Sequence, residues 1–258
     1  MVIIDETILP KNTRRYFSII SGFENNFKLL NISNYKICFS SKPRTALNII
    51  RIFIEEQNSD FILRVYAVGG DGILFDCLNG IMILAARNSE LALIPYCYTN
   101  YLAQHFGKTE INDFRIIKDQ ILSETIPIDV IDCASNYALS FCTIDFEAKS
   151  YMRIKNVFKM KNVFKIALSN KNLNKYYRIN IDGSEITGKY QIINTKADNG
   201  VLDITFDKSS PKHFRAKEIS VYADTPFLLI LDGQIFIESD ASFKIMPCAL
   251  NFVNVKKA

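Results

Sequence analysis

The chain has 258 residues, of which 48% are hydrophobic and 22% are charged, and its formal net charge is +4 at pH 7. This length allows one large domain or two modest ones with a substantial core. The small, dispersed positive charge does not favour nucleic-acid binding, and the sequence contains no zinc-finger or homeodomain pattern. It is compatible with an anionic partner such as a nucleotide or a membrane surface.

The sequence predicts a cytoplasmic protein. No apolar run approaches the ~20 residues that span a bilayer, and the acidic start MVIIDETILPKN differs from a signal peptide. We therefore expect no transmembrane segment, and peripheral membrane contact is left open. The six cysteines form no CxxC pair, which favours buried, reduced thiols. The two histidines, His105 and His213, are too far apart in the sequence to suggest a metal site.

Strand and helix patterns alternate through residues 1–125. Apolar strands are predicted at residues 1–5, 36–40, 61–68 and 91–96, and helical spacing is found over 18–30, 46–57, 73–87 and from 100 onward. Strands that alternate with helices and carry continuous apolar runs are typical of a parallel sheet covered on both faces. The sequence therefore predicts a parallel α/β domain over residues 1–125.

From about residue 127 the pattern changes to apolar or alternating segments separated by turn residues. Asp-Gly pairs at 182–183 and 232–233 and an Asn-Gly pair at 199–200 are strong hairpin signals. We predict an antiparallel β-sandwich domain over residues 126–258. The last strand is a candidate to return to the first domain.

A glycine-rich turn follows the third predicted strand. Four of the ten glycines lie between Gly69 and Gly80, and the strand ending at Val68 continues through Gly69-Gly70-Asp71-Gly72 into a helix. Glycines let the main chain approach a phosphate closely, and the helix N-terminus offers N–H groups and a positive dipole end. An Asp in such a turn is suited to Mg²⁺ or a ribose hydroxyl. The alternative is a tight turn without a ligand.

The order of the motifs resembles the catalytic domain of diacylglycerol kinases and of bacterial and sphingosine lipid kinases. That family carries GGDGT, then N-E-V-x-N-G, then I-P-x-G-T-x-N-D-F-A-R; this chain has GGDG, Asn79-Gly80 and IPYCYTNYLAQHFG. Further on, ADNGVLDITF resembles the family's DG-x-x-D metal segment, and LLILDGQ resembles its L-D-G-E segment. The resemblance spans roughly residues 35 to 255.

The resemblance implies a fold of two parts: an N-terminal parallel α/β nucleotide-binding domain of the lipid-kinase or NAD-kinase type, then an antiparallel β-sandwich domain. It implies that ATP binds between the two and that the β domain presents a lipid hydroxyl. The nucleotide-binding residues so implied are Ser41, Gly69, Gly70, Asp71, Gly72, Thr99 and Asn100. The Mg²⁺ ligands so implied are Asp198 and Asn199, and the catalytic residues are Asp71, Asp232 and Gln234.

Several positions depart from the family pattern. The threonine after GGDG is Ile73, and the aspartate of the DG pair in the metal segment is Asn199. The glutamate of L-D-G-E, which the family uses as proton acceptor, is Gln234, and an amide has no accessible basic form. Asp232 and Glu238 are the candidate substitutes for this base.

Two further departures concern the nucleotide. The family's G-T-x-N-D reads Cys97-Tyr98-Thr99-Asn100-Tyr101, so a glycine and an acid are lost. The opening N-P-x-S-G phosphate loop is absent, and Lys11, Arg14 and Arg15 stand there as phosphate ligands or as surface charges.

These departures predict a lipid-kinase-like protein that binds ATP and is impaired in phosphoryl transfer. One alternative is an active ATP-dependent lipid kinase acting on a diacylglycerol- or sphingosine-like hydroxyl. A second is an NAD-kinase-like enzyme or a non-catalytic regulatory subunit. The sequence does not indicate the lipid or the oligomeric state.

Overall fold

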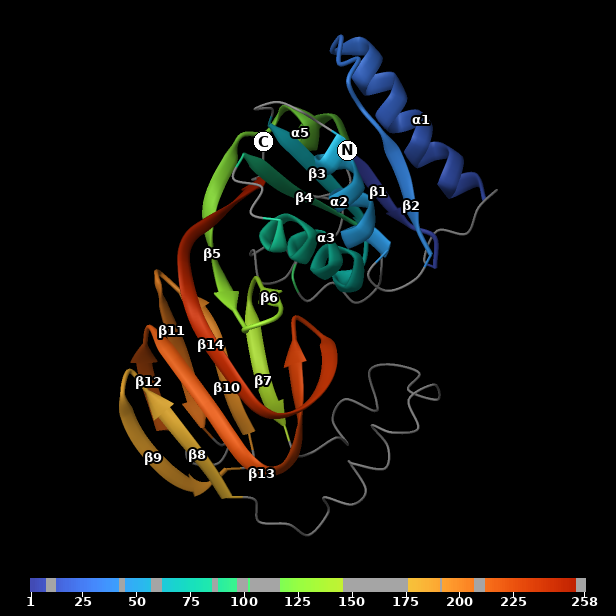
Figure 1. The fold of residues 1–258 in the computed structure, drawn as a ribbon. Coiled ribbons are helices and arrows are strands. Elements are labelled where there is room, and N and C mark those ends of the chain that lie inside the picture. Colours follow the sequence, from blue (N-terminus) through green and yellow to red (C-terminus); the bar gives the residue numbers. More distant parts are fainter. Residues whose placement is uncertain are drawn as a thin grey trace. The chain divides into compact units, whose positions relative to one another are not determined.

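A computed structural model describes the chain except for residues 8–12, 42–44, 57–61, 85–87, 97–101, 103–116, 146–175, 191, 207–211 and 254–258. The chain divides into two compact units (Figure 1). Unit 1 comprises residues 1–128 and 248–258, and unit 2 comprises residues 129–247.

Unit 1 is built on a parallel sheet. Strand β1 (Val2–Asp5) pairs with β2 (Ile37–Ser40) on one side and with β3 (Leu63–Gly69) on the other, and β4 (Ser89–Pro95) lies beyond β3. The end of the last strand, β14 (Gln234–Val253), pairs with β4 in parallel through residues 251–252. Strands β3 and β4 are buried along nearly their whole length, as expected for a parallel sheet with helices on both faces.

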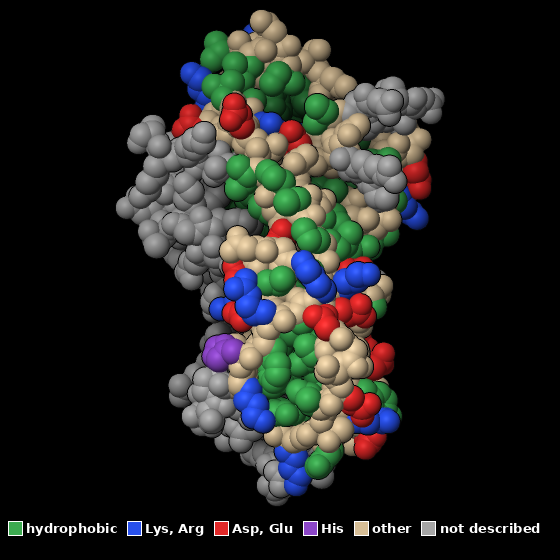
Figure 2. All heavy atoms as spheres, turned by 90° about the vertical axis from the view of Figure 1, so that its left-hand side faces the viewer, with side chains coloured by type: hydrophobic (Ala, Val, Ile, Leu, Met, Phe, Trp, Pro, Cys, Tyr) green, Lys and Arg blue, Asp and Glu red, His purple; other side chains and the backbone are tan. Residues whose placement is uncertain are grey.

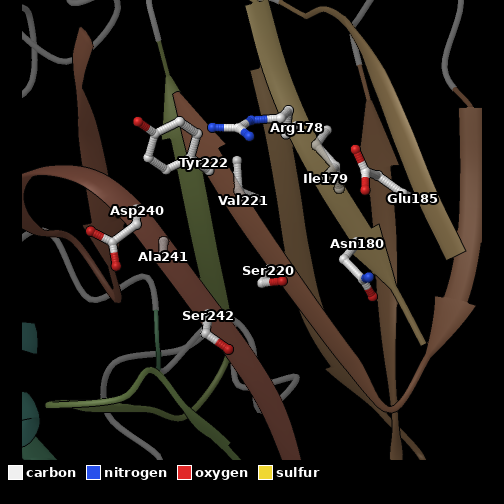
Figure 3. Close-up of a pocket in the computed structure, with 10 residues that line it drawn as sticks. All are labelled: Arg178, Ile179, Asn180, Glu185, Ser220, Val221, Tyr222, Asp240, Ala241 and Ser242. Atoms are coloured by element: carbon white, nitrogen blue, oxygen red, sulfur yellow. The ribbon is translucent and has the colours of Figure 1, made fainter. Parts of the chain in front are cut away.

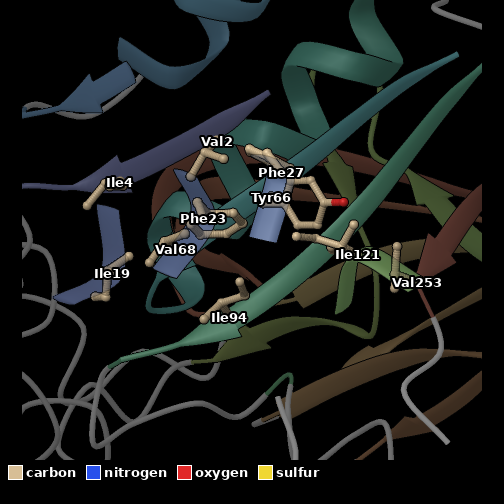
Figure 4. Packing of buried hydrophobic residues seen from close by; sticks show 11 residues of the cluster. Val2, Ile4, Ile19, Phe23, Phe27, Tyr66, Val68, Ile94, Ile121 and Val253 are labelled. Carbon is tan, nitrogen blue, oxygen red and sulfur yellow. The ribbon is translucent and has the colours of Figure 1, made fainter. Parts of the chain in front are cut away.

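One face of this sheet is covered by α1 (Arg14–Leu29) and α5 (Ile117–Leu122). Thr13 caps α1, since its hydroxyl accepts a hydrogen bond from the Tyr16 N–H at 3.3 Å. Three buried residues of α1, spaced four apart, form the apolar stripe that faces the sheet: Ile19, Phe23 and Phe27. They pack against alternate residues of β1, β3 and β4 and against Ile121 and Val253 (Figure 4).

The other face is covered by α2 (Thr45–Glu56) and α3 (Asp71–Ile83). These two helices pack closely at Gly80. A Cβ added at this position would lie 2.9 Å from Ile50 Cδ1 and 3.2 Å from Leu47 Cα on α2. Parallel crossovers are right-handed. The connection through α1 leads from β1 to β2 in one direction across the sheet, whereas those through α2 and α3 lead from β2 to β3 and from β3 to β4 in the other direction. Helices α2 and α3 therefore lie on the face opposite α1.

The side chain of Arg64 on β3 holds α5 in place. Its guanidinium donates to the carbonyls of Gln120, Ile121 and Ser123 at the C-terminal end of α5, at 3.4, 2.8 and 3.1 Å. It also forms an ion pair with Glu90 on β4. Terminal helix carbonyls have no partner within their own helix, so one partly buried cation satisfies several of them.

We expect Arg64→Ala to lower the free energy of unfolding by about 3 kcal/mol, because it leaves partly buried carbonyls and the Glu90 carboxylate without this donor. Urea unfolding followed by circular dichroism measures the loss. Arg51→Ala is the control, since Arg51 is half exposed and pairs with Glu55 on the same helix; it should change the free energy by less than about 0.5 kcal/mol. Equal effects of the two substitutions would contradict the role of Arg64.

Unit 2 is an antiparallel β structure. Its central strand is β13 (Glu218–Leu231), which pairs with β14 along its length, with β8 through Ile219–Ala223 and with β7 through Leu228–Leu231. A register shift between Tyr222 and Phe227 separates the two halves of β13. The remaining strands continue from β7 in the order β10, β11, β12, and β9 continues from β8.

The bounds of these strands follow the turn signals of the sequence. They are β5 (Thr125–Asp132), β6 (Tyr137–Ala138), β7 (Phe141–Asp145), β8 (Tyr176–Ile181), β9 (Ser184–Lys189), β10 (Ile192–Asp198), β11 (Val201–Phe206) and β12 (Lys212–Ala216). Buried and more exposed residues alternate along β8, β11 and the first half of β13, so one face of each forms the core. The predicted fold class is thereby confirmed: a parallel α/β part precedes an antiparallel β part.

The three predicted hairpin turns are confirmed. At 182–183, 199–200 and 232–233 both residues have positive φ, with values of 46° and 86°, 50° and 75°, and 45° and 83°. Two consecutive positive φ angles define the type I′ turn, which Asp-Gly and Asn-Gly favour.

The expectation that all cysteines are buried is wrong for Cys248, which is exposed, and Cys38 is only partly buried. Cys248 lies on β14 where the chain passes from unit 2 to unit 1, and its φ of 51° interrupts the regular alternation of the strand. Cys77, Cys133 and Cys142 are buried thiols, whereas Cys97 and the helix predicted from residue 100 lie outside the described residues. Within the described residues, no helix combines the length and apolar character needed to cross a bilayer.

Candidate functional site

The sheet of unit 1 contains a topological switch point. All its strands are parallel, so their carboxyl ends lie along one edge. The chain leaves β1 toward β2 on one side, then returns across β1 to β3 on the other side. In open α/β sheets, ligands bind outside the carboxyl ends of the strands at such a reversal. Asp5 ends β1 and Gly69 ends β3, so the glycine turn flanks the switch point.

Gly69 is fixed by close packing. A Cβ at this position would lie 2.8 Å from Asp5 Cβ and 2.8 Å from Ile73 Cγ2, so no other residue fits without displacing β1 or α3. The Gly69 carbonyl accepts a hydrogen bond from the Tyr96 N–H at 2.9 Å, which ties the turn to the end of β4. The glycine brings the start of α3 to the reversal between β1 and β3.

Helix α3 begins directly in the glycine turn. Gly70 is its N-cap, in extended conformation, and makes no side-chain capping bond. The first N–H groups of α3 and its positive dipole end therefore lie at the carboxyl edge of the sheet. Asp71 is in the first turn, is 8% exposed, and its Oδ1 accepts from the Leu102 N–H at 3.4 Å. This turn combines main-chain donors with one carboxylate.

Three positions in α3 that align with the family motifs have packing roles. Ile73, which replaces the family's threonine, is 3% exposed and packs over Gly69. The Asn79 side chain donates to the Phe75 carbonyl at 2.8 Å inside the helix, and Gly80 permits the close contact with α2. The Asn79-Gly80 pair therefore stabilises the helix layer behind the turn.

The remaining predicted nucleotide residues divide into two groups. Ser41 is exposed at the carboxyl end of β2, at the same edge as the glycine turn. Arg14 and Arg15 are exposed in the first turn of α1. Thr99, Asn100 and their neighbours in the Cys97–Tyr101 segment lie outside the described residues, as does Lys11.

The sequence did not single out Asp5 and Thr7 as site residues. Asp5 Oδ1 accepts from the Thr7 N–H at 2.9 Å and from the Thr7 hydroxyl at 2.6 Å, which closes the turn after β1. The signal was an apolar strand ending in Asp-x-Thr. This pattern points to the site only once β1 is known to pair with β3, because that pairing places Asp5 beside the glycine turn.

In unit 2, Asp232 organises the hairpin that carries Gln234. Its carboxylate is 1% exposed and accepts hydrogen bonds from the N–H groups of Leu139, Ser140 and Phe141 and from the Ser140 hydroxyl. Burial raises the pKa of the Asp232 carboxyl, and these hydrogen bonds oppose the shift. Both oxygens are engaged, so the geometry gives Asp232 a positioning role rather than access to a substrate proton.

Gln234 begins β14, pairs with Leu231 across the turn and is partly buried. Glu238, the other candidate base, is exposed four residues further along β14. Of the two candidate bases, Asp232 is therefore the one that adjoins Gln234 in the turn, and Glu238 is separated from Gln234 by three residues of β14.

We expect Asp232→Asn to lower the free energy of unfolding by about 3 kcal/mol, because the new NH₂ group would face N–H donors in a buried site. Asp240→Asn on the same strand is the control; Asp240 is exposed and should change the stability by less than about 0.5 kcal/mol. Thermal and urea unfolding of both variants provide the measurement. If Asp232→Asn were as stable as its control, the four-donor cage would be unimportant.

The residues expected to bind Mg²⁺ are already engaged with other groups. Asp198 pairs with Arg215 at 2.9 Å and accepts from the Asn199 side chain at 2.8 Å. The Lys217 ammonium donates to the Gly200 carbonyl at 2.6 Å. In the described part of the chain, no three His, Cys, Asp or Glu side chains gather as a metal site. The segment at 198–200 therefore does not fit a bound Mg²⁺.

Unit 2 also has a shallow hollow of about 370 Å³ over β8, β9, β13 and β14 (Figure 3). The Arg178 guanidinium lies 4.4 Å from the centre of the Tyr222 ring, and Ser220 lies between Asn180 and Ser242 in register. None of the predicted site residues lines this hollow.

The strand order and the position of the glycine turn define the structural class of unit 1. Unit 1 is a doubly wound parallel α/β structure with a glycine-rich turn at its switch point, and an antiparallel β unit follows it in the chain.

Comparison with known family models finds one match, which lies in the N-terminal part of the chain. Residues 19–133 match the family model for the diacylglycerol kinase catalytic domain. The family resemblance predicted from the motifs is thus confirmed for the part that contains the glycine turn and Asn79-Gly80. The segments at 198–200 and 232–234 lie outside the matched residues. A search of curated proteins finds no match.

Solved structures support the fold over almost the whole chain. A candidate diacylglycerol kinase from Bacillus anthracis str. Sterne is 17% identical, with a TM-score of 0.74, and the alignment covers 98% of this chain and 93% of the other. A diacylglycerol kinase structure from the same organism is 17% identical, with a TM-score of 0.71 and coverage of 98% and 95%. At this identity the likeness shows a shared fold.

Proposed function

We propose that this protein is a lipid-kinase-like member of the diacylglycerol kinase type that binds ATP at Gly69–Gly72 and is impaired in phosphoryl transfer. The observation that carries the ATP site is the position of this turn at the switch point, directly before α3. A cytosolic location, where ATP is abundant and thiols stay reduced, fits the proposal.

The charges around the turn suit a polyphosphate. The N–H groups at the start of α3 provide donors and a positive dipole end. Arg14 and Arg15 at the start of α1 add two positive charges at the same sheet edge. Ser41, Thr99 and Asn100 are assigned as further nucleotide ligands by their positions in the family pattern.

Asp71 fits the Mg²⁺ that accompanies ATP. Magnesium is commonly bound by one or two carboxylates together with phosphate oxygens and water. Asp71 supplies one carboxylate within the glycine turn. When bound, Mg²⁺ would neutralise charge on the phosphates, and the role of the chain is to hold the carboxylate in the first turn of α3.

We expect ATP with Mg²⁺ at 100 times its Kd to stabilise the protein by about 2.7 kcal/mol. Asp71→Asn should weaken ATP binding at least tenfold in Mg²⁺ and reduce the dependence of the affinity on Mg²⁺. Asp119→Asn, in the first turn of α5, is the matched control and should bind like the wild type. Isothermal titration calorimetry measures both. Absence of any nucleotide binding by the wild type would refute the ATP site.

The impairment follows from the chemistry at Gln234. Transfer to a lipid hydroxyl requires a group that accepts its proton, and an amide cannot serve. Asp232 is buried under four donors, so it is poorly placed to replace the lost base. Loss of a general base typically lowers the rate by ~10²–10⁴.

We expect Gln234→Glu to raise ATP-dependent phosphorylation of diacylglycerol by about 10²-fold or more, because it restores a carboxylate at this position. Gln234→Asn retains an amide and is the control, with no gain expected. Transfer of labelled phosphate into diacylglycerol or sphingosine in mixed micelles provides the assay.

The same assay separates the alternative functions. An active lipid kinase is favoured by the intact glycine turn, and it would phosphorylate a lipid rapidly as wild type without gain from Gln234→Glu. Phosphorylation of NAD instead of lipid would indicate the NAD-kinase-like alternative. ATP binding without transfer by any variant would indicate a regulatory subunit.

A further inference from the structure

The hairpin between β10 and β11 brings acidic and basic side chains together. Asp198 ends β10, Asn199 and Gly200 form the type I′ turn, and Asp203 lies on β11. The carboxylate of Asp129 on β5 joins this group, since it accepts from the Gly200 N–H at 2.6 Å. In the family pattern this is the metal segment, so the charges that face these carboxylates decide whether a cation binds.

Two basic side chains already contact the groups that a cation would use. Arg215 on β12 donates to Asp198 Oδ2 at 2.9 Å, and the Asn199 amide donates to Asp198 Oδ1 at 2.8 Å. The next residue beyond β12, Lys217, donates to the Gly200 carbonyl at 2.6 Å. Both carboxylate oxygens of Asp198 and the carbonyl of the turn therefore have donors from the chain itself.

Asp203 is also flanked by positive charges. The strand register places it directly opposite Lys196 on β10 and Arg215 on β12. Directly opposite residues of antiparallel strands lie on the same face, with Cβ atoms about 4.5–5.5 Å apart. The segment therefore presents its second carboxylate between two basic residues.

The charges of this cluster balance. The cluster contains three carboxylates (Asp129, Asp198 and Asp203) and three basic groups (Lys196, Arg215 and Lys217). On the face drawn in Figure 2, basic and acidic side chains likewise lie next to one another. Mg²⁺ sheds its water reluctantly and requires oxygen ligands in octahedral arrangement. Here it would have to displace the donors and lie close to three positive charges.

We infer that Arg215 and Lys217 act as built-in cations of the β10–β11 hairpin and replace a divalent metal there. The Asn199 amide completes the arrangement by donating to Asp198, which an aspartate at this position cannot do. The hairpin consequently forms without metal. This inference is independent of the ATP site, because Asp71 belongs to unit 1 and the hairpin belongs to unit 2.

The inference is tested by Mn²⁺ binding, followed by electron paramagnetic resonance without nucleotide in an Asp71→Asn background. The parent protein should bind no Mn²⁺ at micromolar concentration, and MgCl₂ should leave its unfolding temperature unchanged. The triple variant Asn199→Asp, Arg215→Gln, Lys217→Gln should bind one Mn²⁺ and gain about 5 °C or more in unfolding temperature at 100 times its Kd. Arg215 and Lys217 are exposed, so the substitutions are compatible with folding.

Asn199→Asp with Lys212→Gln is the matched control, because Lys212 is an exposed lysine at the start of β12. It should gain no metal site, since Arg215 and Lys217 stay in place. Binding of Mn²⁺ by the parent, or by this control as tightly as by the triple variant, would overturn the inference. If the triple variant binds none, Arg215 and Lys217 are not what excludes the metal, and the inference is equally wrong.

Discussion

The close approach of β1 to the start of α3 at Gly69 is the constraint on which the candidate site depends. A Cβ added at Gly69 would lie less than 3 Å from the side chains of Asp5 and Ile73, so this position has no room for a larger residue. The Tyr96 N–H holds the Gly69 carbonyl from the next strand, so the turn is fixed from both sides. The parallel pairing of β1 with β2 and β3 then places this rigid turn at the reversal of the sheet. Packing alone accounts for the glycine at position 69, and the strand order explains why the turn lies at the switch point of the sheet.

Unit 2 uses a buried carboxylate for a comparable purpose. The four donors on Asp232 come from residues more than ninety positions earlier in the chain, and they join the β13–β14 turn to the start of β7. Asp232, which is a candidate base in the sequence, thus has a structural role, because its carboxylate links two distant segments of unit 2. The same lesson applies to Asp198, whose oxygens accept from Arg215 and Asn199.

Local chemistry made much of the fold predictable. Alternating strands and helices predicted the parallel sheet, and Asp-Gly or Asn-Gly pairs predicted the three type I′ turns, since both signals lie within a few residues. The contacts of Asp232, and those of Lys217 with Gly200, were not predictable, because they join distant segments through strand register. The exposure of Cys248 depends on where β14 leaves unit 2, which no local pattern marks. Among the candidate site residues, the glycine turn was found from its own sequence, whereas Asp5 needed the strand order.

Strand β14 has a consequence for how the protein is made. It begins at Gln234 in unit 2 and ends at Val253, which is buried in the apolar cluster of unit 1 beneath α1. On a ribosome, residues 1–128 emerge before unit 2, yet the cluster of unit 1 lacks Val253 until the end of β14 has followed. All segments of unit 2 are present before that point, so of these two units the one that is synthesised earlier is completed later.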